Sequence, residues 1–145
     1  KNGTAFNVKK RFDRGETNLL LGMGSFWEGV DFAQQDRVIE VIARLPFDNP
    51  KDPFYQKIES WFSKQGKSTF ESYSLPMTVL RFKQAIGRAQ RRPEQRSAIL
   101  LMDNRPLVKS YGKLFLKEVT REVALKYAKF EQVKEDIKDF LEKES

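Results

Sequence analysis

The chain has 145 residues, with 27 lysine and arginine residues against 20 acidic ones, which gives a formal net charge of +7 at pH 7. This length suffices for one domain with a hydrophobic core and is too short for two ordinary domains. Because cysteine and histidine are absent, disulfide frameworks, cysteine nucleophiles, Ser-His-Asp triads and the usual structural zinc sites are excluded. No membrane-length apolar run or secretory leader is apparent, so we expect an intracellular, cytoplasmic protein.

Positive charge is unevenly distributed along the chain. Residues 117–145 contain seven basic and eight acidic residues, so residues 1–116 carry an excess of eight positive charges. Such an excess is expected of a protein that meets nucleic-acid phosphates, although basic proteins without such a partner are also common. Any basic partner surface is therefore expected before the carboxyl-terminal segment.

The amino-terminal part alternates predicted helix and strand. Apolar residues among polar ones predict a short helix over 4–14, which Gly15 ends. The continuous apolar run 18–23 predicts a strand that is buried on both faces, and residues 37–43 predict a second such strand. Residues 48–53, which are rich in proline, asparagine and aspartate, predict a turn-rich connector.

The alternation continues in the rest of the chain. An amphipathic pattern predicts a helix over 54–64. Ser74 is a candidate N-cap for the next helix, which Pro93 ends, and residues 97–102 predict a third buried strand. Two further helices are expected over 106–119 and 121–143. Strands that alternate with helices predict an α/β fold, in which a parallel sheet carries helices on both faces.

The densest cluster of positive charge lies near the end of the helix that Pro93 closes. Gln84, Gly87, Arg88 and Arg91 are spaced i, i+3, i+4, i+7 and share one helical face. A glycine inside a helix costs about 1 kcal/mol relative to alanine, so close approach of a backbone or ligand is a plausible reason for it. Two guanidiniums beside this glycine suggest a phosphate ligand. The alternative is a solvated basic face.

The opposite face of the helix is apolar and contains Val79, Phe82, Ile86 and Ala89.

A second notable stretch is the loop 24–32, which directly follows the first predicted strand. It combines two glycines, two carboxylates and three aromatic rings. Ligands of open α/β sheets bind at the carboxyl ends of strands, so this loop is a candidate site. The alternative is a turn whose Phe26 and Trp27 cover the end of the sheet while Glu28 and Asp31 stay solvated.

Together the two stretches resemble one family, the carboxyl-terminal part of DinG-type helicases in the XPD-like branch of superfamily two. The loop 24–32 resembles helicase motif V, and residues 84–91 resemble motif VI, QxxGRxxR. Leu45-Pro46-Phe47 resembles the connector between them, and Asp103-Asn104-Arg105 fits the family's ending. The resemblance implies a second RecA-like lobe over 1–119 that lacks its first strand, with a C-terminal helix over 120–145 packed on it.

By this resemblance, Arg91 is the arginine finger of ATP hydrolysis, while Arg88 and Gln84 position phosphate and water. Gly87, Glu28, Gly29 and Asp31 are expected at the nucleotide side, where the two carboxylates would link the nucleotide site to the DNA path. Residues expected to touch single-stranded DNA are Ser25, Phe26, Trp27, Arg81, Lys83 and Arg92.

The resemblance also implies ATP and Mg²⁺, bound mainly by a first RecA-like lobe, because neither GxxxxGK[ST] nor a DEAH-like box occurs in this sequence. The expected partners are that first lobe and single-stranded DNA, with no membrane. The implied function is ATP-driven 5′-to-3′ DNA unwinding in repair or replication, and the chain alone is expected to be inactive. The alternatives are a non-catalytic basic module that binds nucleic acid, or a helicase-like ATPase joined to a nuclease. Some family members carry an iron–sulfur cluster in the first lobe, about which a chain without cysteine says nothing.

Overall fold

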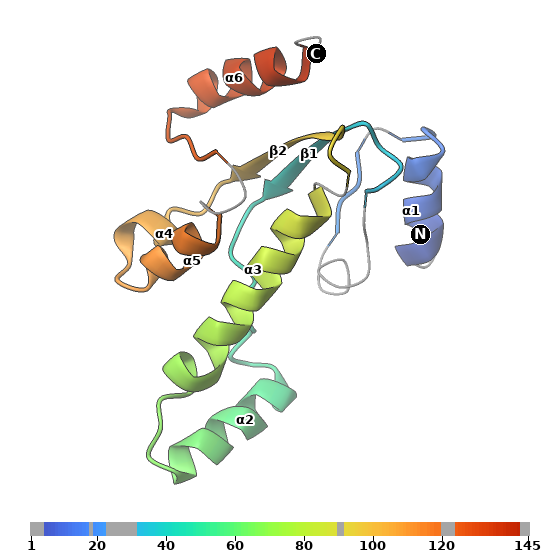
Figure 1. Ribbon diagram of the computed structural model, residues 1–145. Coiled ribbons are helices and arrows are strands. Elements are labelled where there is room, and N and C mark those ends of the chain that lie inside the picture. Colours follow the sequence, from blue (N-terminus) through green and yellow to red (C-terminus); the bar gives the residue numbers. More distant parts are fainter. Residues whose placement is uncertain (1–4, 18, 23–31, 90–91, 120–123, 143–145) are drawn as a thin grey trace.

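The computed structural model describes residues 5–17, 19–22, 32–89, 92–119 and 124–142. Among these residues the sheet consists of two parallel strands, β1 (Arg37–Ile42) and β2 (Arg96–Leu101), paired from Arg37 opposite Arg96 to Ile42 opposite Leu101 (Figure 1). These strands confirm the positions of the two predicted over 37–43 and 97–102. The predicted burial on both faces is wrong, because only one face of β1 packs on the core, while Ile39 and Val41 on its other face are 50% and 54% exposed, and the β2 residues are only partly buried. The helical elements are α1 (Ala5–Asp13), α2 (Pro53–Lys64), the π-helical turn η2 (Phe70–Ser74), α3 (Leu75–Ala89), α4 (Arg105–Val108), α5 (Gly112–Val119) and α6 (Phe130–Glu142).

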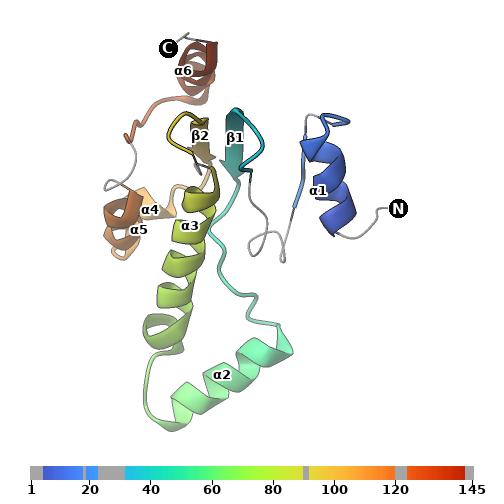
Figure 2. The same cartoon turned by 45° about the vertical axis from the view of Figure 1, so that its right-hand side comes forward.

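The elements form layers around this sheet. Helix α3 lies on one side of the strands and α6 on the other (Figures 1 and 2). Helix α6 is tied to β2 by a hydrogen bond of 3.2 Å, which the Arg96 guanidinium donates to the Phe140 carbonyl. The arrangement confirms the predicted α/β class with helices on both faces. None of the described helices is long and apolar enough to cross a membrane.

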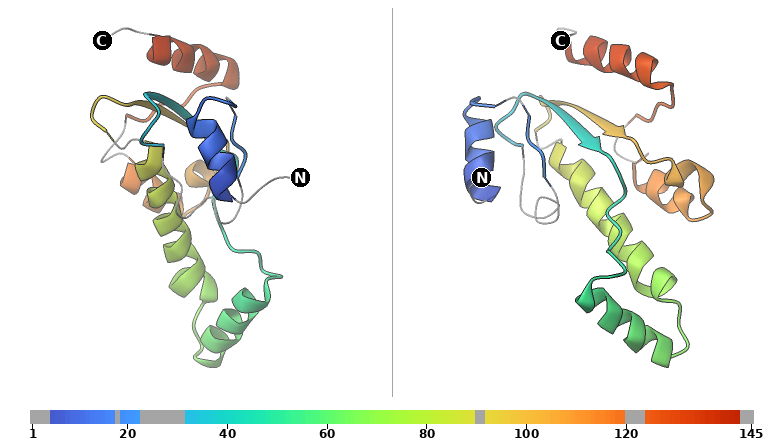
Figure 3. Two further views of the ribbon diagram at one scale, coloured as in Figure 1. Left: turned by 90° about the vertical axis from the view of Figure 1, so that its right-hand side faces the viewer. Right: turned by 180° about the vertical axis from the view of Figure 1, so that it is seen from behind.

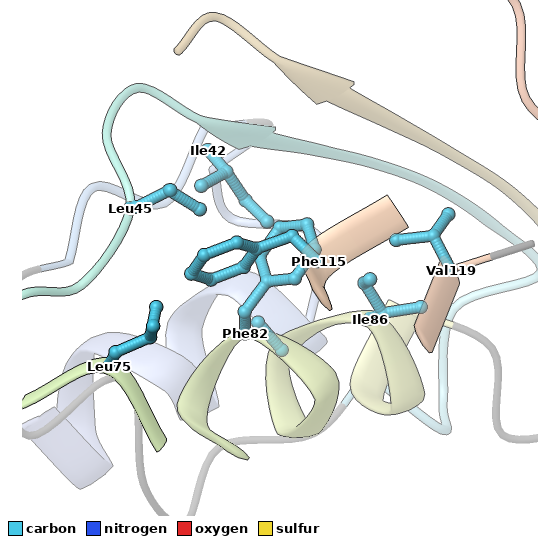
Figure 4. Packing of buried hydrophobic residues seen from close by; sticks show 8 residues of the cluster. Ile42, Leu45, Leu75, Phe82, Ile86, Phe115 and Val119 are labelled. Atoms are coloured by element: carbon cyan, nitrogen blue, oxygen red, sulfur yellow. The ribbon is translucent and has the colours of Figure 1, made fainter. Parts of the chain in front are cut away.

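The hydrophobic core lies between the sheet, α3 and α5 (Figure 4). Its central rings are Phe82 of α3 and Phe115 of α5, whose centroids lie 5.5 Å apart. The apolar face predicted for α3 is confirmed, since Phe82, Ile86 and Ala89 are buried and Val79 packs against the cluster. The other buried members of the cluster are Ile42, Leu45, Leu75, Ala85 and Val119.

The segment 19–22 is not a strand, which corrects the prediction for 18–23 over the residues that the structure describes. Leu19 and Leu21 are 71% and 80% exposed. An apolar run becomes a strand only where a neighbouring strand supplies hydrogen-bond partners, and the ladder among the described residues joins only β1 and β2. The hydrophobic run alone therefore overpredicted one strand.

The start of the central helix also differs from the prediction. Ser74 does not cap α3, because the helical path continues back through η2 to Phe70. The Ser74 hydroxyl instead pairs with the Tyr55 hydroxyl at 2.8 Å, and the Ser74 carbonyl accepts a bond of 2.6 Å from Thr78 Oγ1. A serine that bonds within a helix and across to α2 gives no N-cap, so the sequence signal was misread.

The two predicted carboxyl-terminal helices have different bounds. The segment 106–119 is split into α4 and α5, which lie close together, and α6 begins only at Phe130. Residues 124–129 carry no helix, and all of them are exposed. Short helical stretches are marginal in water without a buried face, and the exposure of these residues accounts for the late start of α6.

Gly112 permits the close packing of α5 on α4. A Cβ atom at this position would overlap the Pro106 carbonyl oxygen and would lie 2.8 Å from the Pro106 Cα. Because the conflict is with backbone, we expect Gly112→Ala to lower the free energy of unfolding by about 1–3 kcal/mol or more. Urea unfolding followed by circular dichroism measures this effect, with Lys113→Ala, an exposed neighbour on the same helix, as the matched control. Equal stability of the two variants would contradict the packing role.

Candidate nucleotide and nucleic-acid site

The predicted phosphate stripe lies on the last turns of α3, over the described residues Gln84, Gly87 and Arg88. Arg88 is only 9% exposed, although arginine is rarely buried without a charged or hydrogen-bonding partner. Gln84 is exposed and Gly87 is partly buried. Arg88 is therefore not part of a solvated basic face, which was the alternative interpretation of the stripe.

Glu40 of β1 is the carboxylate that acts on Arg88. It lies on the same side of β1 as the buried residues Val38 and Ile42, one residue in two along the strand. Burial raises the pKa of Glu40 to about 7, and the attraction of the Arg88 guanidinium opposes that rise only in part. Glu40 Oε2 is buried without a hydrogen-bond partner among the described residues. The stripe thus has a poorly solvated acidic neighbour.

Gly87 leaves open space on the stripe. Among the described residues, a Cβ atom built at this glycine would meet no heavy atom within 4 Å. Its backbone does not have a positive φ angle, unlike those of Gly15 and Gly66. Among the described residues, neither packing nor backbone conformation requires a glycine here.

The segment that follows residues 84–91 is hydrogen-bonded to the end of the loop 24–32 and to the residues after it, where β1 and β2 begin. Gln95 is buried and donates from Nε2 to the carbonyl oxygens of Phe32 and Gln35, both at 2.8 Å. Arg92 donates to Asp36 Oδ1 at 2.7 Å. The residues that follow the motif V loop are thus fastened to the residues that follow α3, so that both motifs lead to one edge of the sheet.

Two other basic residues of α3 hold neighbouring segments. Arg81 donates to Asp48 Oδ1 at 2.6 Å and to the Pro46 carbonyl at 3.3 Å, which fastens the connector after β1 to α3. Lys83 Nζ lies 3.1 Å from Glu118 Oε2 and ties α3 to α5. The predicted DNA-contacting residues Arg81, Lys83 and Arg92 therefore each have an acidic partner in this structure.

The opposite edge of the sheet carries a second ionic cluster. Asp103 Oδ2 accepts a hydrogen bond of 2.9 Å from the Leu45 backbone N–H, and the Arg105 guanidinium donates to both oxygens of the carboxylate. Burial alone would raise the pKa of Asp103, but the hydrogen bonds from Arg105 and Leu45 outweigh it and hold that pKa at about 2. The Arg105 guanidinium also lies 4.9 Å from the centre of the Phe47 ring. This cluster joins the ends of β1 and β2.

Several predicted site residues lie outside the described residues. They are Arg91 and the motif V residues Ser25, Phe26, Trp27, Glu28, Gly29 and Asp31. Their roles stay predictions. The structure adds residues that sequence reasoning missed, above all Glu40, whose signal was a lone charge in the apolar run Val38–Ile42.

Fold and site together define an α/β lobe of the RecA-like type, with an arginine-bearing helix packed on a parallel sheet. Residues 1–122 match the family described as Helicase C-terminal domain. The chain belongs to this family, as the C-terminal helicase domain of a DinG-type protein, which confirms the resemblance of its motifs.

Curated relatives agree with this assignment. The chain is 38% identical over 114 residues to the 3′-5′ exonuclease DinG of Bacillus subtilis (strain 168), a match to 79% of this chain and 12% of the relative. It is 33% identical over 111 residues to the ATP-dependent DNA helicase YoaA of Escherichia coli (strain K12), covering 73% of this chain and 18% of the relative. A DinG exonuclease of Staphylococcus saprophyticus is 33% identical over 135 residues, covering 93% and 14%. The chain thus spans less than a fifth of each of these relatives.

Proposed function

We propose that the chain is the second RecA-like lobe of an ATP-dependent DNA helicase. ATP binds between this lobe and a first RecA-like lobe of the same protein. Arg91 is the arginine finger that neutralises charge developing on the transferred phosphoryl group, and Arg88 and Gln84 position phosphate and water. The observation that carries the proposal is the burial of Arg88 against Glu40 on the motif VI face of α3.

The electrostatics of α3 favour a positioned site over a general basic surface. A non-catalytic module that binds nucleic acid by charge alone gains most from cations that lack acidic partners. On α3, Arg81 and Lys83 instead pair with Asp48 and Glu118, and Arg92, which follows the helix, pairs with Asp36. What α3 offers is one buried guanidinium held in place beside a glycine, which suits a directed contact with a nucleotide phosphate. In this proposal the second lobe contributes a positioned guanidinium rather than a broad positively charged surface.

Among the described residues, no group of three or more His, Cys, Asp or Glu side chains could hold a metal ion. Mg²⁺ at nucleotide sites is usually held by one or two carboxylates together with phosphates and water. We place the Mg²⁺ site and the phosphate-binding loop on the first lobe. The isolated chain should accordingly hydrolyse no ATP at a helicase rate.

The single-stranded DNA path is assigned to Ser25, Phe26 and Trp27 of the motif V loop, with Arg81, Lys83 and Arg92 as phosphate contacts. The three cations would have to exchange or share their acidic partners with DNA. Exposed ion pairs contribute about 0–1 kcal/mol each, so exchange at Lys83 and Arg92 costs little. Exchange at Arg81 costs more, because only 20% of its side chain and 21% of that of Asp48 are exposed. Glu28, Gly29 and Asp31 would link this path to the nucleotide side.

Unwinding of tailed duplexes tests the proposed activity and its direction. With ATP, the full-length protein should unwind a duplex that carries a 5′ single-stranded tail and leave a 3′-tailed duplex intact, as expected for 5′-to-3′ movement in DNA repair or replication. Preference for the 3′ tail would overturn the polarity. Failure to unwind either duplex, despite DNA-stimulated ATP hydrolysis, would mean that the motor moves along DNA without unwinding it.

The name of the Bacillus subtilis relative, 3′-5′ exonuclease DinG, favours a second candidate, in which this lobe belongs to an ATPase joined to a nuclease. In that protein the lobe would drive or regulate strand degradation. The two candidates differ in product. A shortened, end-labelled strand formed without ATP supports the nuclease arrangement, whereas intact separated strands formed only with ATP support the helicase.

Gly87→Ala should affect stability and activity in opposite directions. Alanine favours a helix by about 1 kcal/mol relative to glycine, and the added Cβ meets no described atom, so the thermal midpoint should rise. Turnover of ATP should fall, because the methyl group enters the face that approaches the nucleotide. Calorimetry and a steady-state ATPase assay measure the two effects. Higher stability with unchanged turnover would show that the open space at Gly87 has no part in the reaction.

A further inference from the structure

Helix α2 extends from the end of α3 that is remote from the sheet (Figures 1 and 3). None of its residues is buried. It is attached through one face only, by the hydrogen bond of 2.8 Å between Tyr55 and Ser74 and by contact of the Phe62 and Tyr73 rings at 6.5 Å. Within the part of the chain that the structure describes, most of the rest of its circumference is exposed.

The ends of α2 are well defined. The Asp52 side chain caps its amino terminus by accepting bonds from the backbone N–H groups of Phe54 and Tyr55 at 2.8 and 3.2 Å. At its carboxyl terminus, Gly66 adopts a φ of +66°, the left-handed conformation that commonly terminates helices. The helix is therefore a preformed element, and its exposed face presents side chains at fixed intervals.

That exposed face carries what we term the α2 stripe, consisting of Phe54, Lys57, Trp61 and Lys64. At 100° per residue the four side chains fall within a quarter of the helix circumference. Phe54 and Trp61 are 68% and 57% exposed. Within the part of the chain that the structure describes, neither lysine forms an ion pair. The nearest acidic residue in the helix, Glu59, is on the far face.

Alternation of rings and lysines is a chemical signature of single-stranded nucleic acid. Exposed aromatic rings stack on unpaired bases, while cations beside them meet the phosphates. Cores of protein–protein interfaces are depleted in lysine. Two lysines without an ion pair, placed among the aromatic rings, therefore do not suit the centre of a protein–protein interface. Phe54 and Trp61 lie about 10 Å apart along the helix axis, which allows each ring to stack on a separate base.

We propose that the α2 stripe is an additional contact site for single-stranded DNA, at which Phe54 and Trp61 stack on bases and Lys57 and Lys64 neutralise phosphates. The proposal rests on the assignment of the chain to a DNA motor. It places a contact outside the two helicase motifs, on the arm formed by α2. The Trp61 ring is steadied for this role by edge-on packing against Phe62, with centroids 4.7 Å apart.

The test is binding of the full-length protein to a fluorescent oligothymidylate at several salt concentrations. Trp61→Ala should weaken binding about tenfold to a hundredfold. The double variant Lys57→Gln, Lys64→Gln should lower the slope of log affinity against log salt by about 1.4. The matched control is Lys134→Gln, Lys138→Gln, which removes two exposed lysines of α6 and should leave the slope unchanged. Circular dichroism confirms that each variant is folded.

The outcomes separate this inference from the proposed function. Wild-type affinity and slope in the α2 variants would overturn the DNA contact. So would unchanged DNA binding together with a lower melting temperature, because the stripe would then pack against another part of the protein. Weaker binding in the α2 variants, with normal ATP turnover at saturating DNA, supports it. If instead the wild-type protein binds DNA through the stripe but shows no DNA-stimulated ATP hydrolysis, the motor assignment fails while the contact site stands.

Discussion

Replacement of Arg91 by alanine in the full-length protein should lower the rate of ATP hydrolysis by about 10³- to 10⁵-fold. The reason is that an arginine presented from a facing lobe stabilises charge that develops only in the transition state. Affinity for ATP and for single-stranded DNA should therefore be largely retained. A steady-state ATPase assay and equilibrium binding of a fluorescent nucleotide and oligonucleotide measure these three quantities.

Two companion variants sharpen this prediction. Arg91→Lys keeps the charge but loses the planar fork of donors, so it should recover little of the rate. Arg37→Ala, which removes an exposed arginine at the start of β1, should leave turnover unchanged. Equal losses of DNA affinity and turnover in Arg91→Ala would instead identify a binding residue, as the alternative of a non-catalytic basic module requires.

Glu40→Gln should stabilise the chain at pH 8 by up to about 3 kcal/mol, which is the free-energy equivalent of the shift from 4.5 to about 7. Since burial raises the pKa of Glu40 in the folded state, the folded chain holds this proton more tightly than the unfolded chain. The stabilising contribution is complete below about pH 4.5 and is lost as the pH rises to about 7. Glutamine carries no titrating group, so the advantage of the variant should grow over this window.

Urea unfolding at pH 4 and pH 8 checks this prediction. The two proteins should have similar stability at pH 4 and differ at pH 8, with Asp139→Asn on the exposed part of α6 as the control for loss of one negative charge. A variant that is less stable than wild type at pH 8 would show that the attraction between Glu40 and Arg88 outweighs the cost of burying the carboxylate.

Periodicity predicted much of the fold because the decisive patterns are local. The apolar runs that form the strands at 37–43 and 97–102, and the four apolar positions of α3, were identified without any tertiary information. Apolar residues at helical spacing report a buried face wherever a neighbour exists to cover it. The same rule failed at 19–22, where Leu19 and Leu21 are exposed and no ladder forms among the described residues.

The candidate site, like the fold, was predicted where the pattern is local and missed where residues distant in sequence meet. Spacing placed Gln84, Gly87 and Arg88 on one face of α3, but it could not reveal that Glu40, 48 residues earlier than Arg88, lies opposite on β1. Likewise, the acidic partners of Arg81 and Arg92 are Asp48 and Asp36, both remote in sequence. Ion pairs of this kind depend on how β1 docks beside α3, which no local pattern encodes.

The most direct test of the central claim is the rate of ATP hydrolysis by the full-length protein with and without single-stranded DNA, measured for the wild type and for Arg91→Ala. If this lobe donates the arginine finger of a DNA motor, DNA should stimulate the wild-type rate severalfold or more, and the variant should show almost no turnover under either condition. A wild-type rate that is indifferent to DNA, or a variant that responds to DNA as the wild type does, would contradict the account.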